Sequence, residues 1–106
     1  MSYIVQFSPV ARDQLGDIED YIAEAGSPDT AARYVDATVS YCVSLADFPL
    51  RGRRRDDLMP GLRITNYRGR TVVAFVVDEP AGTVSIVGVF YGGQDYESRC
   101  PGTPND

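Results

Sequence analysis

The chain has 106 residues, of which 43% are hydrophobic, so it is long enough for one domain with one core and too apolar for a disordered protein. No apolar run approaches the roughly 20 residues of a membrane span, and the first residues lack the features of a signal peptide, so we expect a cytoplasmic protein. There is no His, and the two Cys, Cys42 and Cys100, have no CxxC spacing, which excludes a zinc site, Cys-His catalysis and a disulfide framework. We therefore expect no metal and no cofactor, with Cys42 in the core and Cys100 as an exposed thiol.

The net charge of −5 hides an uneven distribution of charge. Between Arg51 and Arg70 there are seven Arg but only two acidic residues, Asp56 and Asp57, and the basic residues of the chain are all Arg. Arg suits bidentate contacts with carboxylate or phosphate groups and stays charged at any ordinary pH. This segment therefore either meets an acidic partner or reflects a general preference for Arg over Lys and is only solvated.

The N-terminal half predicts one strand followed by two helices. Residues 3–7 alternate weakly between apolar and polar, as in a strand. Ser8-Pro9 supplies an N-cap and a proline at the first helical position, and the amphipathic helix that follows ends at Gly26. Ser27-Pro28 begins a second helix in the same way, and Phe48-Pro49 ends it. Because so few residues join the two helices, we expect them to form an antiparallel hairpin.

The C-terminal half predicts a loop followed by three strands. Residues 50–61 are polar, basic and rich in turn formers, and we interpret them as a loop with short helical content. Strands are predicted over residues 61–67, 71–78 and 83–91, and the second of these is expected to be covered on both faces. The predicted fold is thus α+β: an N-terminal strand, and a two-helix hairpin packed on one face of a mostly antiparallel sheet completed by a three-stranded meander. We expect a single domain over residues 1–97 and a flexible tail over residues 98–106.

The last predicted strand carries apolar residues on both of its faces. Simple alternation places Val84, Ile86 and Phe90 on one face, and Val87, Val89 and Tyr91 on the other. The two helices cover only one face of a sheet, so some apolar surface is left for a partner.

Several short motifs together resemble one known family. In chain order they are Phe7-Ser8-Pro9 followed by Ala11, Pro49 before the basic segment, Pro60-Gly61-Leu62-Arg63 leading into a strand, Tyr67 and Gly69-Arg70 before the central strand, and Val87-Gly88-Val89-Phe90-Tyr91-Gly92-Gly93-Gln94-Asp95 at the end. Their order and spacing, over about residues 2–97, resemble the RelE/ParE superfamily of bacterial toxin–antitoxin toxins, and within it the ParE branch.

The resemblance implies a small toxin that is neutralised by a ParD-like antitoxin. ParE-type toxins act on DNA gyrase, whereas RelE-type relatives cleave mRNA on the ribosome. A third alternative is a degenerate module that binds an antitoxin without being toxic. We expect no sequence-specific nucleic-acid binding by the toxin alone.

The residue types present argue against the ribonuclease alternative. RelE-like relatives use Lys, Arg and Tyr, whereas this chain has no Lys and no His, and Arg does not act as a base near neutral pH. Where ribonuclease relatives carry a catalytic Arg in the central strand, this chain has Thr71. The segment Tyr91-Gly92-Gly93-Gln94 likewise lacks the His or basic residues of many relatives. We therefore assign no catalytic residue and expect a toxin that inhibits gyrase by binding it.

Two sets of candidate binding residues follow from the resemblance, and both have simpler structural explanations. An antitoxin helix is expected to dock on the helical hairpin or on the uncovered sheet face, with an extended arm following the sheet. The antitoxin candidates are Leu15, Ile18, Tyr21, Ile22, Tyr34, Tyr41, Arg53, Arg54 and Arg55. The candidates for gyrase binding are Arg63, Arg70, Tyr91, Gln94 and Tyr96. The apolar candidates are equally explained as core, the Tyr as amphipathic cover of the sheet and the Arg as a solvated loop.

Overall fold

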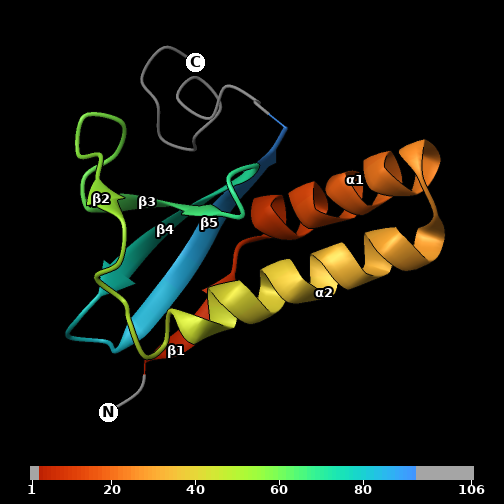
Figure 1. The fold of residues 1–106 in the computed structure, drawn as a ribbon. Coiled ribbons are helices and arrows are strands. Elements are labelled where there is room, and N and C mark those ends of the chain that lie inside the picture. Colours follow the sequence, from red (N-terminus) through yellow and green to blue (C-terminus); the bar gives the residue numbers. More distant parts are fainter. Residues whose placement is uncertain (1–2, 93–106) are drawn as a thin grey trace.

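The computed structural model describes residues 3–92, and these form a helical hairpin and a five-stranded sheet (Figure 1). The elements are β1 (Ile4–Phe7), α1 (Pro9–Ala25), α2 (Pro28–Ser44), β2 (Arg53–Arg54), β3 (Leu62–Tyr67), β4 (Thr71–Asp78) and β5 (Thr83–Tyr91). The strand order is β1-β5-β4-β3-β2, with β1 parallel to β5 and every other pair antiparallel. The predicted α+β fold is confirmed. The expectations for Gln94, Tyr96, Cys100 and the tail lie outside the described residues.

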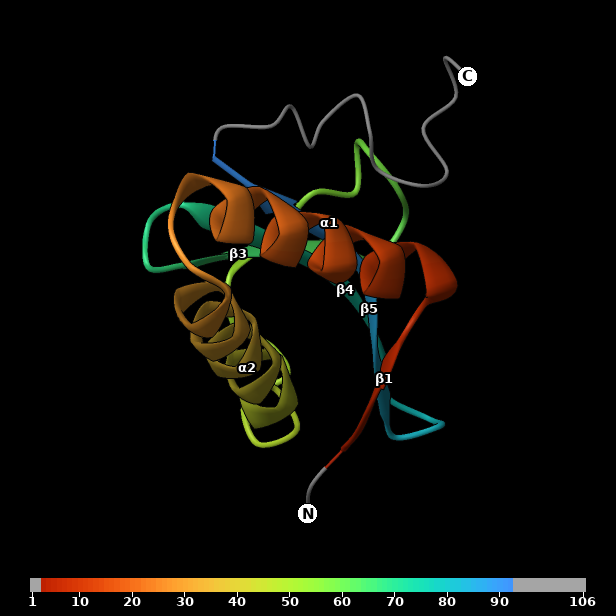
Figure 2. The ribbon, with the colours of Figure 1, turned by 90° about the vertical axis from the view of Figure 1, so that its right-hand side faces the viewer.

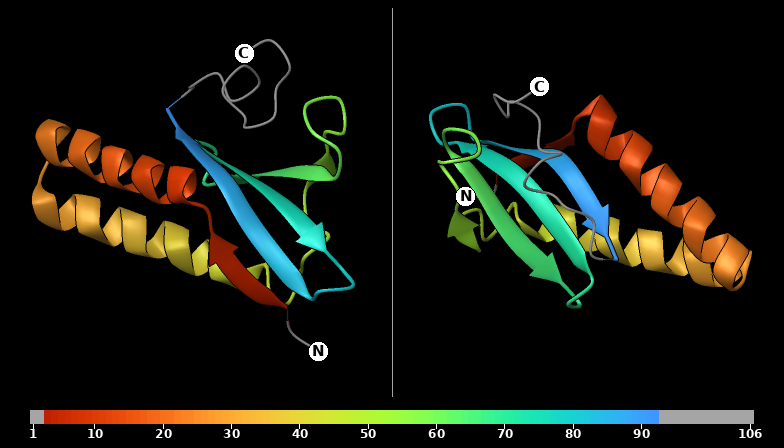
Figure 3. Two further views of the ribbon diagram at one scale, coloured as in Figure 1. Left: turned by 180° about the vertical axis from the view of Figure 1, so that it is seen from behind. Right: turned by 90° about the horizontal axis from the view of Figure 1, so that it is seen from above.

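The two helices begin where the Ser-Pro pairs predicted. The Ser8 hydroxyl oxygen accepts a hydrogen bond from the Ala11 N–H at 3.0 Å, and that of Ser27 accepts one from the Thr30 N–H at 3.2 Å. Each cap satisfies an N–H group that has no partner within its helix. In Figure 1 and in both panels of Figure 3 the two helices run side by side, and the tip of the hairpin extends beyond the sheet. No helix in the described part of the chain is long and apolar enough to cross a membrane.

The second helix ends earlier than predicted, at Ser44 rather than at Phe48-Pro49. The Leu45 N–H donates to the Cys42 carbonyl at 3.0 Å, and the Ala46 N–H donates to the Val43 carbonyl at 3.0 Å. These bonds span three residues, so the last turn tightens before the proline is reached, as is common at helix ends. Sequence periodicity does not distinguish such a turn from a further turn of α-helix.

Both helices pack on the same face of the sheet, with α1 against β5 and α2 alongside α1 (Figure 2). Ala11, Leu15 and Ile18 of α1 are buried in one cluster with Phe75 of β4. β1 pairs with β5 only over residues 83–86 of β5. Beyond these residues, α1 lies beside this edge of β5 in the place of β1. There the Gln14 side-chain oxygen accepts a hydrogen bond from the Val89 N–H at 2.8 Å. This bond satisfies a backbone donor that no strand reaches.

The predicted alternation in β5 is wrong after Val87, because the strand contains a β-bulge. Ala74 pairs with Gly88 whereas the next residue, Phe75, pairs with Ile86, so Val87 is one extra residue in β5. An extra residue reverses the faces of all that follow it. Val89 therefore packs under the helices with Ile86, whereas Phe90 packs on the opposite face.

The opposite face of the sheet carries a second, smaller cluster, formed by Leu62, Ile64, Ala74 and Phe90. Leu58 and Met59, from the segment between β2 and β3, pack against it. Part of the surface that the sequence left for a partner is therefore covered by the chain itself. The segment forms turns rather than the expected short helix, and residues 53–54 form a two-residue strand that was not predicted. So short a strand depends on its pairing with β3 and not on a local pattern.

Cys42 lies in the main core, as predicted, and burial raises the pKa of its thiol to about 12. The thiol therefore stays protonated and unreactive at pH 8.

In a Cys100→Ser background, which leaves Cys42 as the single thiol, we expect no reaction with a disulfide reagent under native conditions and complete reaction in denaturant. Rapid native labelling would contradict the burial of Cys42.

Candidate partner-binding site

Five tyrosines from four elements form a continuous row between the helices and the sheet. Ring centroids are 5.9 Å apart for Tyr21 and Tyr91, 5.5 Å for Tyr91 and Tyr34, 6.3 Å for Tyr34 and Tyr67, and 4.8 Å for Tyr67 and Tyr41. These separations lie in the range of favourable edge-to-face and offset contacts. We call these residues the tyrosine row. It fills the space beside α2 with side chains that are each apolar along the ring and polar at the tip.

Two hydroxyl groups of the tyrosine row, those of Tyr34 and Tyr41, are bound within the protein. The Tyr34 hydroxyl shares a short hydrogen bond with the hydroxyl of Thr71 in β4, and the Tyr41 hydroxyl shares one of 2.9 Å with that of Thr65 in β3. Both threonines are buried. These bonds fix α2 to the sheet, so Tyr34 and Tyr41 have a structural role whatever partner they also contact.

Arginines stack on the tyrosine row and next to it. The Arg51 guanidinium lies 5.6 Å from the centroid of Tyr41 and 5.3 Å from that of Phe48. The Arg68 guanidinium lies 5.4 Å from the centroid of Tyr67. Stacking orients a guanidinium through its face and leaves its N–H groups able to donate in the ring plane. The two arginines therefore present oriented donors at the surface.

Two of the seven arginines between Arg51 and Arg70 are paired with the two aspartates of the same segment. Arg54 forms two hydrogen bonds of 3.0 Å with Asp56, and Arg55 forms two of 2.8 and 2.9 Å with Asp57. The hydrogen bonds from Arg54 and from the Gly61 N–H lower the pKa of Asp56, and those from Arg55 lower the pKa of Asp57. Bidentate pairs of this kind hold the turn between β2 and β3 in one conformation. Arg54 and Arg55 are thus less available to a partner than the sequence suggested.

The lowered pKa values predict an acid-sensitive loop. Since the folded-state pKa of Asp56 lies below its ordinary value of 3.8, its stabilising effect is complete above about pH 3.8 and is lost as the pH falls through the lower folded value. We expect the Gly61 amide proton, which bonds to Asp56 at 2.8 Å, to shift upfield and exchange faster only below that pH. Titration by NMR measures this, with Asp56→Asn as the control that removes the transition. A transition near pH 6 would contradict the assignment.

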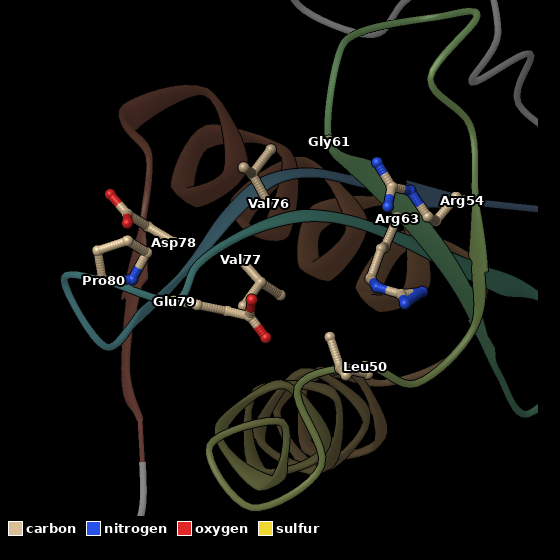
Figure 4. Close-up of a pocket in the computed structure, with 9 residues that line it drawn as sticks. All are labelled: Leu50, Arg54, Gly61, Arg63, Val76, Val77, Asp78, Glu79 and Pro80. Atoms are coloured by element: carbon tan, nitrogen blue, oxygen red, sulfur yellow. The ribbon is translucent and has the colours of Figure 1, made fainter.

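A pocket of about 550 Å³ opens between the segment after α2 and the ends of β3 and β4 (Figure 4). Its lining residues are Leu50, Arg54, Gly61, Arg63, Val76, Val77, Asp78, Glu79 and Pro80. In Figure 4, Arg63 and Glu79 reach the pocket from different sides, with Val77 between them and Leu50 on the wall nearest α2. Within residues 3–92, the Arg63 side chain has no hydrogen bond or ion pair, although it is half-buried. The pocket thus holds an arginine that is available for an anionic group.

The structure separates the predicted antitoxin candidates into core and surface residues. Leu15 and Ile18 are buried in the main core, and Ile22 packs against it. Tyr21 is 63% exposed at one end of the tyrosine row, and Tyr34 and Tyr41 are half-buried within it. The exposed residues of this set are therefore Tyr21, Arg53 and Arg54.

Among the predicted gyrase candidates in residues 3–92, Arg63 lies apart from Arg70 and Tyr91 along the sheet. Arg70 and Tyr91 lie together, because the Gly92 N–H bonds to the Arg70 carbonyl at 3.0 Å and Tyr91 pairs with Thr71. Arg63 pairs with Phe75 instead, several residues along β3, which at about 3.3 Å per residue separates it from Arg70 by more than 10 Å. It belongs to the pocket of Figure 4.

Several surface residues were missed by sequence reasoning. Phe48 and Leu50 are 58% and 57% exposed, Tyr67 lies in the middle of the tyrosine row, and Glu79 lines the pocket. The two large apolar residues that flank Pro49, just after a predicted helix, could have indicated an exposed apolar surface. No local signal identifies Tyr67 or Glu79, because the strand pairing brings them to these places. Among the described residues, no group of three or more His, Cys, Asp or Glu side chains could hold a metal ion.

The helical hairpin on a mostly antiparallel sheet is the fold of the RelE/ParE class of toxins, and three solved structures share it. A chain of the RelBE2 toxin–antitoxin complex from Mycobacterium tuberculosis is 24% identical with a TM-score of 0.64, and the match covers 86% of this chain and 99% of that one. A chain of the chromosomal ParDE system from P. aeruginosa is 21% identical with a TM-score of 0.72, covering 86% and 97%. E. coli RelE toxin, as a mutant in the free state, is 15% identical with a TM-score of 0.65, covering 93% of each chain.

A sequence comparison with protein families identifies the particular family. Residues 5–96 match the family described as "ParE toxin of type II toxin-antitoxin system, parDE". The match covers most of the sequence, so the chain belongs to the ParE toxin family. No curated protein sequence gives a significant match.

Proposed function

We propose that this ParE-family toxin is neutralised by a ParD-like antitoxin and acts by binding DNA gyrase rather than by cleaving mRNA. The observation that carries the choice is the absence of His and Lys from a chain whose family match is to ParE toxins. The relatives from M. tuberculosis and P. aeruginosa belong to toxin–antitoxin pairs, which supports an antitoxin as the first partner.

The placement of the polar groups supports binding over catalysis. Cleavage of RNA at a 2′-hydroxyl needs a base and a group that stabilises the phosphate within reach of the same atoms. Here Arg63 and Arg70 lie apart along the sheet, and the hydroxyls of Tyr34 and Tyr41 are bound to threonines. These groups do not converge on one reacting position.

The surface proposed to bind gyrase is the end of the sheet at the turn between β3 and β4. Arg68 and Arg70 are exposed there, and Tyr67 and Tyr91 flank them in the tyrosine row. Aromatic and Arg side chains are the types most often found at the energetic centres of protein interfaces. Gln94 and Tyr96 were also predicted to bind gyrase. They lie outside the described residues but follow Tyr91 in sequence, and we include them in the proposed surface.

One observation favours the ribonuclease as a second candidate. The pocket of Figure 4 contains a carboxylate, Glu79, as well as Arg63, and these types can serve as a base and a phosphate-binding group. If this candidate is right, ribosome-associated mRNA is cleaved on toxin expression and Glu79→Gln abolishes the cleavage.

The deciding experiment expresses the toxin without antitoxin and measures plasmid supercoiling and mRNA integrity in the same cells. We expect growth arrest, impaired gyrase activity and intact mRNA, with purified toxin binding gyrase directly. Arg70→Glu should weaken that binding about 10-fold, because it places a charge of the wrong sign in the interface. Arg12→Glu, which changes the same charge on the exposed side of α1, is the matched control and should bind like the wild type.

Each other result selects another function. Cleaved mRNA with unaffected gyrase identifies the ribonuclease. Normal growth at a verified expression level identifies a module that binds an antitoxin without toxicity. Equal weakening by Arg70→Glu and Arg12→Glu indicates a general charge effect and removes the proposed gyrase surface.

A further inference from the structure

Two concave surfaces of the protein share one wall, formed by Leu50. The first is the pocket of Figure 4. The second, of about 440 Å³, is lined by Tyr3, Phe48, Pro49, Leu50 and Arg51. Because Leu50 lines both, they adjoin in one surface region beside the segment after α2 and the ends of β3 and β4. We call it the Leu50 groove, and its principal residues are Phe48, Leu50, Arg51, Arg63, Val77 and Glu79.

The groove combines exposed apolar side chains with unpaired charges. Phe48 and Leu50 are 58% and 57% exposed, which is unusual for two large apolar residues so close in the chain. Within residues 3–92, neither Arg51 nor Arg63 has a carboxylate partner, whereas Arg54 and Arg55 nearby do. Asp56 and Asp57 are thus bound to Arg54 and Arg55, and within residues 3–92 the two groove arginines have no carboxylate bound to them.

Of the two groove arginines, Arg51 is held in a defined direction by aromatic rings. The Arg51 guanidinium stacks on Phe48 and Tyr41, at 5.3 and 5.6 Å from the ring centroids. Arg63 is half-buried and extends from β3, where it pairs with Phe75. Less side-chain entropy is lost on binding when an arginine is already oriented in this way. The guanidinium group of either residue can make a bidentate contact with one carboxylate.

The groove also carries a negative charge at its far end. Glu79 lines it with no ion pair among the described residues, whereas the Asp78 carboxylate accepts a hydrogen bond from the Ala81 N–H at 3.2 Å. A ligand that follows the whole groove thus passes two positive charges, Arg51 and Arg63, and then two carboxylates, Asp78 and Glu79, with Leu50 between the two arginines. A polyanion such as RNA matches only part of this pattern, whereas a peptide with acidic, aliphatic and basic side chains matches all of it.

We propose that the Leu50 groove binds an extended arm of the antitoxin, with acidic side chains on Arg51 and Arg63, an aliphatic side chain on Leu50 and a basic side chain beside Glu79. The proposal rests on the proposed function, since it names the surface of the same toxin that the antitoxin occupies. It also assigns Arg63 to the antitoxin rather than to gyrase. Opposite charges at the two ends of the groove fix the direction of the arm and reject antitoxins with another charge order.

The test measures the affinity of the purified full-length toxin for the antitoxin encoded beside its gene. Arg63→Glu should weaken binding about 30-fold or more, because it leaves a carboxylate of the partner facing another carboxylate in a half-buried site. Glu79→Lys should weaken it less, by up to about 5-fold, since the charge is exposed. Arg12→Glu is the control for net charge and should have no effect. Arg63→Gln, which preserves size and polarity, should lie between the wild type and Arg63→Glu.

A charge exchange identifies the contact directly. In a set of antitoxins whose acidic residues are changed one at a time to Lys, one should restore binding to Arg63→Glu while weakening binding to the wild type. Circular dichroism and the unfolding midpoint establish that each toxin variant is folded.

The outcomes separate this proposal from the proposed function. If the wild-type toxin does not bind the antitoxin, the proposed function fails. If the wild type binds, but Arg63→Glu and Glu79→Lys each bind the antitoxin as tightly as the wild type does, the groove assignment is wrong and the antitoxin docks elsewhere. If Arg63→Glu keeps its antitoxin affinity but no longer binds or cleaves RNA, the groove serves a nucleic acid and the inference is overturned.

Discussion

Replacing Phe75 by Ala should destabilise the protein by about 3–5 kcal/mol, the cost of removing a large buried aromatic side chain. Phe75 lies in the middle strand β4, is fully buried, and belongs to the cluster that joins both helices to the sheet. Its loss leaves a cavity where neither helix can move in without losing other contacts. Since small domains are stable by about 5–15 kcal/mol, we expect a melting temperature lower by more than about 10 °C.

Urea unfolding of the purified variant gives the free energy, and Phe48→Ala is its matched control. Phe48 is the same residue type but is 58% exposed, and its visible contact is the stacked Arg51. Its removal should cost about 1 kcal/mol at most. Equal losses at the two positions would mean that the cluster around Phe75 is not the core that stabilises the fold.

The parts of the fold that the sequence predicted correctly are those with a local cause. A serine hydroxyl and a proline ring act within one turn of the chain, so Ser8-Pro9 and Ser27-Pro28 locate the helix starts without knowledge of the rest of the fold. The long apolar strands β4 and β5 are marked by their own composition.

The errors arose where a distant contact decides the local structure. The bulge at Val87 reverses the faces of the end of β5, and its one local signal is the adjacent Gly88, since a glycine inside a strand often marks a bulge. The two-residue strand β2 exists because β3 provides a partner for Arg53 and Arg54. The sequence counted the arginines, whereas the structure distinguishes Arg54 and Arg55, which are paired with aspartates, from Arg63, which has no such partner within residues 3–92.

The candidate site was predictable in its residue types but not in its geometry. Four members of the tyrosine row, Tyr21, Tyr34, Tyr41 and Tyr91, were named as candidate partner contacts from the sequence. Tyr67 joins them only because β3 and α2 approach one another, with Tyr41 bound to Thr65 of the same strand. The Leu50 groove depends on residues from 48 to 80, whose contact requires the sheet to be assembled.

Replacing Gly52 by Ala should detach β2 from β3 and distort the Leu50 groove. Gly52 has φ +80°, and an added Cβ would lie 2.2 Å from the Ile64 carbonyl oxygen. The contact is with backbone, so no side-chain rotation relieves it, and the pairing of Arg53 with Ile64 must shift. We expect a conformational cost of about 1–2 kcal/mol together with a further cost of about 1–3 kcal/mol for the overlap.

Gly69→Ala is the control that separates the two costs. Gly69 has a similar φ of +73°, but an added Cβ would meet no atom within 4 Å, so only the conformational cost of about 1–2 kcal/mol applies. Hydrogen exchange distinguishes the variants locally: the Arg55 amide, which donates to the Leu62 carbonyl at 2.8 Å, should exchange faster in Gly52→Ala and remain unchanged in Gly69→Ala. Because Gly52 follows Leu50 and Arg51 directly, antitoxin affinity should fall in the same variant. Equal stability and exchange in both variants would show that the chain does not pass so close to Ile64, and the shape assigned to the Leu50 groove would then be wrong.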